Sequence, residues 1–163
     1  MRELTGLYVE DEEKNVLLMQ ARFSLFGIKI IGLDQFPQKL DGLYDFIIDN
    51  NVDFLIIDHE LEKASVQYKG INVLKEIRKN DSNIYAILLT NYPLNSYRGE
   101  LGEYDFQLEK NELSQDGKMQ ELAEKIRRAC ELRHDNDLLA SMDKRNDELQ
   151  NIIQQIKKIS EEG

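Results

Sequence analysis

The alternation of short apolar runs with stretches of helical periodicity is the feature that most constrains how this chain folds. Runs of strand length stand at residues 4–9, 28–33, 52–58, 83–90 and 104–110, the last with alternating apolar and polar side chains. Apolar residues at helical spacing lie between them at 14–26, from Pro37 to about residue 51, and at 70–80, and we expect a short or irregular helix within 94–103. Repeated strand–helix units build a parallel sheet, so we predict an α/β fold with a doubly wound, five-stranded parallel sheet.

A long helix is predicted from about Asp116 almost to the end of the chain. Its second part carries a heptad repeat with two seam rows, one of Leu139, Asn146 and Ile153 and the other of Met142, Leu149 and Ile156. A single buried asparagine in such a seam favours a two-stranded parallel coiled coil. We therefore predict a globular domain at 1–132 and a helical extension at 133–163 that forms a homodimer.

An amphipathic helix folded back on its own domain is the alternative for this extension. Leu138, Ile152 and Ile159 flank the seam and widen the apolar stripe, which favours the alternative. The globular domain is expected to have helices for both faces of its sheet already, which favours pairing between chains.

Composition and charge exclude several classes of partner. The chain has 163 residues and a formal net charge of −10, and residues 1–116 carry 12 basic and 21 acidic side chains. An acidic surface repels phosphate backbones and anionic lipid, so we expect no direct binding to nucleic acid or membranes. No run approaches the ~20 apolar residues of a membrane span, and the first residues lack a secretion signal, so a cytoplasmic location is expected. The single cysteine, Cys130, is expected to be a packed thiol.

Polar side chains follow the predicted strands where each one ends. Glu10, Asp11 and Glu12 follow the first strand, Asp58 ends the third, Thr90 ends the fourth and Lys110 ends the fifth. Each has an ordinary explanation taken alone, since acids and Asp favour helix N-termini and Thr favours strands. In an open parallel sheet, however, these ends meet at one edge, where ligands bind.

Such a combination has a chemical use. Clustered carboxylates favour a bound cation, and oxygen-rich sites suit Mg²⁺. Asp58 could then act as an anionic nucleophile toward a phosphoryl group, with Thr90 donating a hydrogen bond and Lys110 supplying positive charge. We expect Mg²⁺ at Glu10, Asp11 and Asp58.

The motifs together resemble the receiver domains of two-component response regulators, a flavodoxin-like fold, over about residues 3–130. "LYVEDE" resembles the first strand of the family with its acidic pair, Glu10 and Asp11, and "FLIID" resembles the third strand with the phosphoacceptor, Asp58. "KGINVLKEIRK" is similar to the third helix of the family, "ILLT" to its fourth strand, and Lys110 falls at the position of its lysine. The chain differs in the long proline-free segment 59–69 and at Asn91, Gln107 and Asn111, where the family prefers a small residue, an aromatic and a proline.

The resemblance implies a signalling domain phosphorylated by a histidine kinase or a phosphotransfer protein. It implies no enzyme activity beyond phosphorylation and dephosphorylation of Asp58 itself. The alternative is a pseudo-receiver that acts as a dimerising or interaction scaffold without phosphorylation. An aspartate-dependent phosphatase is disfavoured because its nucleophile would stand on the first strand, and a flavin site is disfavoured because the first loop is acidic.

Overall fold

The computed structural model describes residues 2–61, 66–91 and 104–162. Its elements, in chain order, are β1 (Leu4–Val9), α1 (Glu13–Ser24), β2 (Ile28–Gly32), α2 (Leu43–Asp49), β3 (Phe54–Asp58), α3 (Gly70–Arg78), β4 (Tyr85–Thr90), β5 (Phe106–Glu109), the 3-10 helix η2 (Lys110–Ser114) and α4 (Lys118–Glu162). The short helix expected within 94–103 lies outside the described residues.

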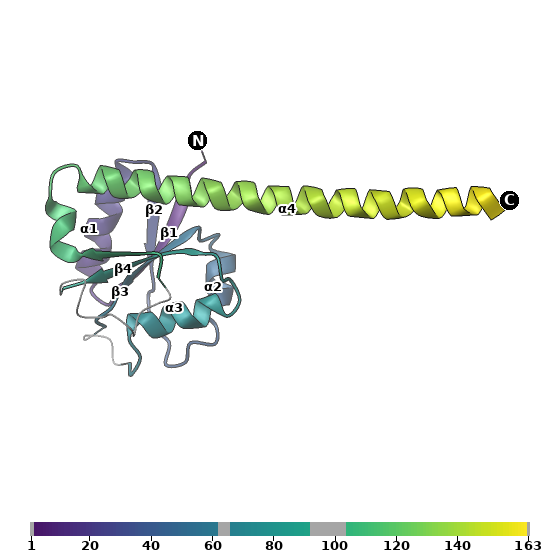
Figure 1. The fold of residues 1–163 in the computed structure, drawn as a ribbon. Coiled ribbons are helices and arrows are strands. Elements are labelled where there is room, and N and C mark those ends of the chain that lie inside the picture. The colour runs from purple at the N-terminus through teal and green to yellow at the C-terminus, as the bar shows by residue number, and fades with distance from the viewer. Residues whose placement is uncertain (1, 62–65, 92–103, 163) are drawn as a thin grey trace. The chain divides into compact units, whose positions relative to one another are not determined.

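The five strands form one parallel sheet in the order β2-β1-β3-β4-β5. The predicted doubly wound α/β fold is thereby confirmed, including the position of β5 at an edge. Helices α2 and α3 cover one face of the sheet, and α1 with the beginning of α4 covers the other (Figure 1). Because both faces are covered, the four consecutive apolar residues of the central strand β3 are buried, and so is its last residue, Asp58.

Each face of the sheet has its own packed core. Leu7, Leu55, Ile57 and Leu88 project toward α2 and α3, where they join one apolar cluster. On the other face the rings of Phe23 and Phe54 meet with their centroids 6.3 Å apart. Phe54 also requires the glycine at position 6, because a Cβ there would lie 2.3 Å from its ring. The site at the strand ends therefore rests on a rigid base.

The prediction that the second helix begins at Pro37 is wrong. Helix α2 begins at Leu43, and residues 38–42 form bends and a turn. The carbonyl of Pro37 accepts a hydrogen bond from the Tyr68 hydroxyl at 2.6 Å, and Phe36 and Leu40 pack against the core. Contacts with distant parts of the chain therefore hold this segment in a non-helical conformation.

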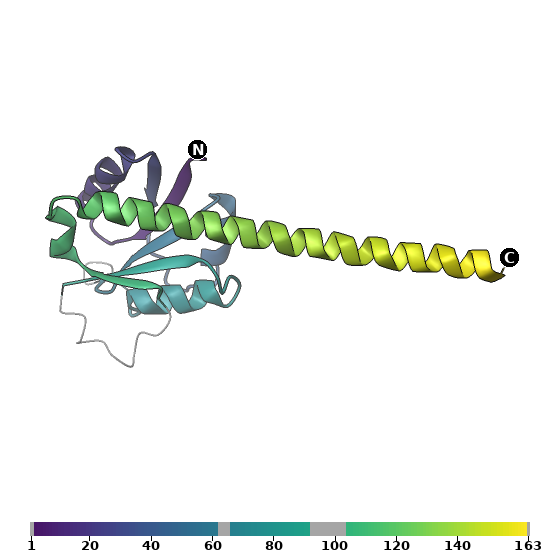
Figure 2. The same ribbon diagram turned by 45° about the horizontal axis from the view of Figure 1, so that its top comes forward.

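The chain divides into two compact units, Met1–Arg128 and Ala129–Gly163. Figure 2 shows that α4 is one continuous helix, whose first turns belong to the first unit and whose remainder makes up the second. In the first unit Arg127 donates to the carbonyl of Phe26 at 3.1 Å, which ties the first part of α4 to the turn that follows α1. Within the described residues, no helix is both long and apolar enough to cross a membrane.

Candidate functional site

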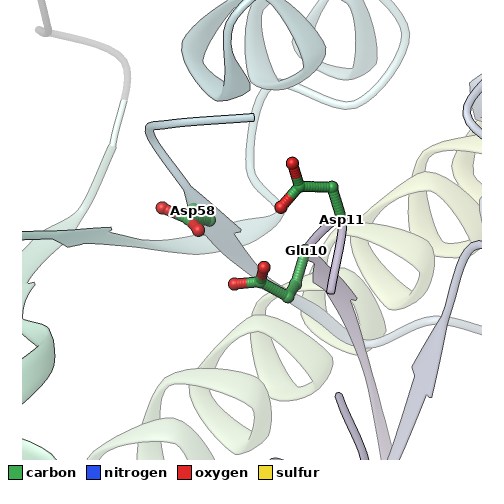
Figure 3. Close-up of side chains that lie close together, drawn as sticks. All are labelled: Glu10, Asp11 and Asp58. Carbon is green, nitrogen blue, oxygen red and sulfur yellow. The ribbon is translucent and has the colours of Figure 1, made fainter. Parts of the chain in front are cut away.

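Three carboxylates converge where the central strands end. Glu10 and Asp11 follow β1, and Asp58 is the last residue of β3. Figure 3 shows the three side chains close together, and one oxygen from each lies within 4.8 Å of the others. Glu10 is 3% exposed and Asp58 2% exposed, whereas Asp11 is half-buried. The parallel register of β1 and β3 produces this meeting, because it brings residues far apart in sequence to one sheet edge.

Lys110 supplies the positive charge of the cluster. The strand β5 ends at Glu109, so Lys110 is the first residue of η2 and not part of the strand as its alternating pattern had predicted. Its Nζ donates to Asp58 Oδ2 at 2.7 Å and lies 4.0 Å from Glu10 Oε2. Burial alone lowers the pKa of Lys110, but the hydrogen bond and the charge of Asp58 outweigh it, so that the pKa is raised and the ammonium is retained.

Glu10 is the carboxylate whose ionisation is most disturbed. Burial raises its pKa to about 8, assisted by hydrogen bonding with Asp58 and Asp11 and by the negative charge of Asp58. The amide of Glu12 donates to its Oε1 at 3.0 Å, which opposes the shift without cancelling it. Without a metal ion the cluster therefore holds a proton at neutral pH.

Tyr8 is a member of the site that sequence reasoning missed. Its hydroxyl donates to Glu10 Oε2 at 3.1 Å and is buried. Burial and the charges of Glu10 and Asp58 raise the pKa of Tyr8, so the phenol stays neutral and remains a donor. The signal was available in the sequence, because residues two apart on a strand face the same side of the sheet.

The backbone after Asp58 is fixed on both sides. The amide of Glu60 donates to Asp58 Oδ1 at 3.1 Å, and the amide of His59 bonds to the carbonyl of Leu89 at 3.0 Å. Gly70, which begins α3, passes so close that a Cβ there would lie 2.0 Å from the Asp58 carbonyl oxygen. The long segment 59–69 thus starts and ends tightly against β3, and its residues 62–65 lie outside the described part.

An open cavity of about 190 Å³ gives access to the cluster. It is lined by Glu10, Asp11, Glu12, Asn15, Asp58, Glu60, Asn91 and Lys110. Four of the five predicted site residues therefore share one cavity. The fifth, Thr90, is buried at the end of β4 and is not part of this lining, where its neighbour Asn91 appears instead.

Gln107 occupies a position that the sequence comparison had singled out. It is buried on β5 opposite Leu88 of β4, and it accepts a hydrogen bond from the Tyr104 hydroxyl at 2.7 Å. Its Nε2 atom has no hydrogen-bond partner among the described residues. Tyr104 is thus an aromatic residue that is hydrogen-bonded to this position, three residues before it in the sequence.

The donor set fits a small, hard divalent cation. Mg²⁺ prefers carboxylate oxygens and binds through a few of them together with water. Burial raises the pKa of Glu10, and the neighbouring carboxylates Asp58 and Asp11 add to the shift, so a cation bound among them would favour the ionised form. Glu10, Asp11 and Asp58 are thus suited to hold Mg²⁺.

Comparison with known proteins finds similar folds among the solved structures. The response regulator TrrA from Thermotoga maritima, solved in complex with Mg²⁺–BeF, is 26% identical, with 77% of this chain and 98% of that chain covered and a TM-score of 0.57. A response regulator receiver domain from Clostridium thermocellum is 21% identical, with 80% and 97% covered and a TM-score of 0.60. TrrA in a complex with the histidine kinase ThkA is matched at 23% identity, with 76% and 97% covered and a TM-score of 0.56. No family model and no curated protein matches the chain.

Proposed function

We propose that this chain, a divergent response regulator receiver domain followed by a long C-terminal helix, accepts a phosphoryl group on Asp58 with the help of Mg²⁺. The observation that carries the proposal is the environment of Asp58. Its carboxylate ends the central strand, Lys110 Nζ lies 2.7 Å away, and two further carboxylates lie within 4.8 Å. Structural carboxylates do not require such a group of charges at the mouth of a cavity.

The chemistry follows from the groups present. One Asp58 oxygen attacks phosphorus, the bond from phosphorus to the donor nitrogen breaks, and the donor imidazole leaves with the electron pair of that bond. The product is an acyl phosphate. A divalent cation held by Glu10, Asp11 and Asp58 would supply positive charge to the phosphoryl oxygens. Lys110 is placed to stabilise the same negative charge through its ammonium.

Two neighbouring side chains complete the proposed site. Thr90 ends β4, and we propose that its hydroxyl donates a hydrogen bond to a phosphoryl oxygen after the transfer. Asn91 lines the cavity beside Asp58 and can donate through its amide. Glu10 must lose its proton before the cation binds fully, so the metal and the phosphoryl group are expected to bind in a pH-dependent manner.

The phosphodonor would be a histidine kinase or a phosphotransfer protein. TrrA, to which this chain is similar, has been solved in a complex with the histidine kinase ThkA, and this similarity supports a kinase as the phosphodonor. The modified residue would be part of the chain itself, so the domain would act as a signalling element and not as an enzyme with a separate substrate.

The phosphorylation state would be relayed through dimerisation or partner binding. The heptad seam of residues 139–156 supports a parallel homodimer through residues 133–163, since its side chains are exposed along α4. The Asn146 amide can pair with its counterpart across a two-fold axis in that arrangement.

The second candidate function is a pseudo-receiver that works as a dimerising scaffold. The departures at Asn91 and Gln107 favour it, together with the large exposed apolar surface of α4. In this case Asp58 and Lys110 would form only an ion pair.

Treatment with Mg²⁺ and beryllofluoride, or with acetyl phosphate, separates the two candidates. A receiver should show large NMR shifts around Asp58 with beryllofluoride and a mass increase of one phosphoryl group with acetyl phosphate. Asp58→Asn should abolish both responses, and Lys110→Gln should slow labelling by about a hundredfold. A wild-type chain without either response supports the scaffold, and unchanged labelling of Asp58→Asn would refute the assignment of the acceptor.

A further inference from the structure

The carboxylate of Glu10 is held at both of its oxygens. The backbone amide of Glu12 donates to Oε1 at 3.0 Å, and the hydroxyl of Tyr8 donates to Oε2 at 3.1 Å. Lys110 Nζ lies 4.0 Å from the same Oε2 atom. A carboxylate offers about four lone-pair directions, so two donors leave the remaining ones for a cation. Because each donor holds a different oxygen, the carboxylate is restricted to one orientation.

The ring that carries the hydroxyl is itself fixed. Tyr8 lies in β1, between Gly32 of β2 and Ile56 of β3, and only 3% of it is exposed. Burial and the charges of Glu10 and Asp58 raise the pKa of Tyr8, so the phenol remains a donor. A donor on a ring that cannot move determines where its acceptor lies.

We propose that Tyr8 is a positioning residue of the cation site, whose hydroxyl holds Glu10 in the orientation in which it binds Mg²⁺. This inference rests on the proposed function, because it concerns the same three carboxylates. A group already oriented loses less conformational freedom when it binds, which increases affinity. Groups that hydrogen-bond a metal ligand contribute to metal binding in this way without touching the metal.

Lys110 gives the loss of the hydroxyl a second consequence. Without the Tyr8 bond, Oε2 of Glu10 is able to close the 4.0 Å gap to the ammonium of Lys110. The resulting ion pair would compete with the cation for the same oxygen. A hydrogen bond that served only to satisfy a buried carboxylate would contribute to the stability of the fold and leave the affinity for the cation unchanged.

Tyr8→Phe removes only the hydroxyl and keeps the ring in the core. Mg²⁺ titration followed by the NMR signal of the Asp58 amide measures the affinity, at pH 9 so that Glu10, with its pKa of about 8, is mostly ionised. We expect the variant to bind Mg²⁺ about 10–100-fold more weakly than the wild type. Tyr104→Phe is the matched control, because its phenol bonds to Gln107 and does not line the cavity of the site, and it should bind as the wild type does.

A double-mutant cycle separates positioning from a structural role. If Tyr8 acts through Glu10, Tyr8→Phe should change the affinity little in a Glu10→Ala background, where Asp11 and Asp58 remain. An equal loss in both backgrounds would mean that Tyr8 acts through the fold, and it would overturn the proposal. Mg²⁺ binding of equal strength in the wild type and Tyr8→Phe would refute this inference alone. A wild type without Mg²⁺ binding near Asp58 would refute the cation site and the inference together.

The wild type alone provides a second measurement, which does not depend on the folding of Tyr8→Phe. The hydroxyl proton of Tyr8 should exchange slowly with water, because its bond to Glu10 is buried. Saturating Mg²⁺ should shift the NMR signal of this proton and leave that of the Tyr104 hydroxyl in place. A Tyr8 signal that Mg²⁺ does not move would contradict the proposed link between the hydroxyl and a cation-binding carboxylate.

Discussion

At the scale of single residues, the raised pKa of Glu10 couples the stability of the folded domain to pH. Its pKa is about 8 in the folded chain without metal, against an ordinary value of 4.5, because the side chain is buried beside two other carboxylates. Between these values the folded state binds a proton that the unfolded state has released. This difference in bound protons determines whether the free energy of unfolding rises or falls with pH.

We predict that the metal-free protein becomes less stable as pH rises from 4.5 to about 8. The free energy of unfolding falls over this window because the unfolded chain binds fewer protons than the folded one. Urea unfolding at several pH values measures it. Glu10→Gln has no carboxyl group to titrate and should flatten the slope, so an equally steep slope in that variant would assign the effect to another group.

We further predict that Mg²⁺ binds more tightly as pH rises toward 8. The proton on Glu10 has to leave before its oxygen can bind the ion, so the affinity should increase by up to about tenfold per pH unit below pH 8. Calorimetric titration at pH 6, 7 and 8 provides the measurement. Glu10→Gln should bind more weakly at every pH, with little dependence on pH; a wild-type affinity that is flat from pH 6 to 8 would contradict the protonated state of Glu10.

At the scale of the elements, the start of α3 packs closely against the backbone of Asp58. Gly70 leaves no room for a side chain, since a Cβ would lie 2.0 Å from the Asp58 carbonyl oxygen and 2.6 Å from Ile57 Cγ2. Both neighbours belong to the buried central strand and cannot move aside easily. The packing of this helix against β3 therefore depends on the glycine.

Gly70→Ala is predicted to lower the free energy of unfolding by about 1–3 kcal/mol, the cost of overpacking a tight contact. It should also shift the NMR signals of Asp58. Gly42→Ala is the matched control. Gly42 directly precedes α2, and a Cβ there would meet nothing within 4 Å. Equal effects of the two variants in chemical denaturation would argue against the steric explanation.

At the scale of the whole molecule, the sheet and its two packed faces lie within Met1–Arg128. A chain cut after residue 132 keeps all five strands and the helical turns that cover them. The boundary at 132 remains a prediction, and truncation is its test.

We predict that residues 1–132 fold into a monomer that unfolds in one cooperative transition and still binds Mg²⁺. The expected loss is confined to self-association, because the heptad rows lie beyond the cut. Sedimentation and thermal unfolding measure the two properties. An unfolded fragment would place the boundary further along α4, and a fragment that still dimerises would move the dimer interface to the globular domain.

The sequence by itself determined the α/β class, the doubly wound parallel sheet and the residues at the strand ends, because periodicity and strand length are local properties. The start of α2 depended on tertiary contacts, since the Pro37 carbonyl bonds to Tyr68, 31 residues away. The same holds for the 2.7 Å contact of Lys110 with Asp58, for Tyr8 as a support of Glu10 and for the absence of Thr90 from the cavity lining. These features arise where segments distant in the chain meet at one sheet edge, and their distances depend on register and packing, which periodicity in the sequence does not specify.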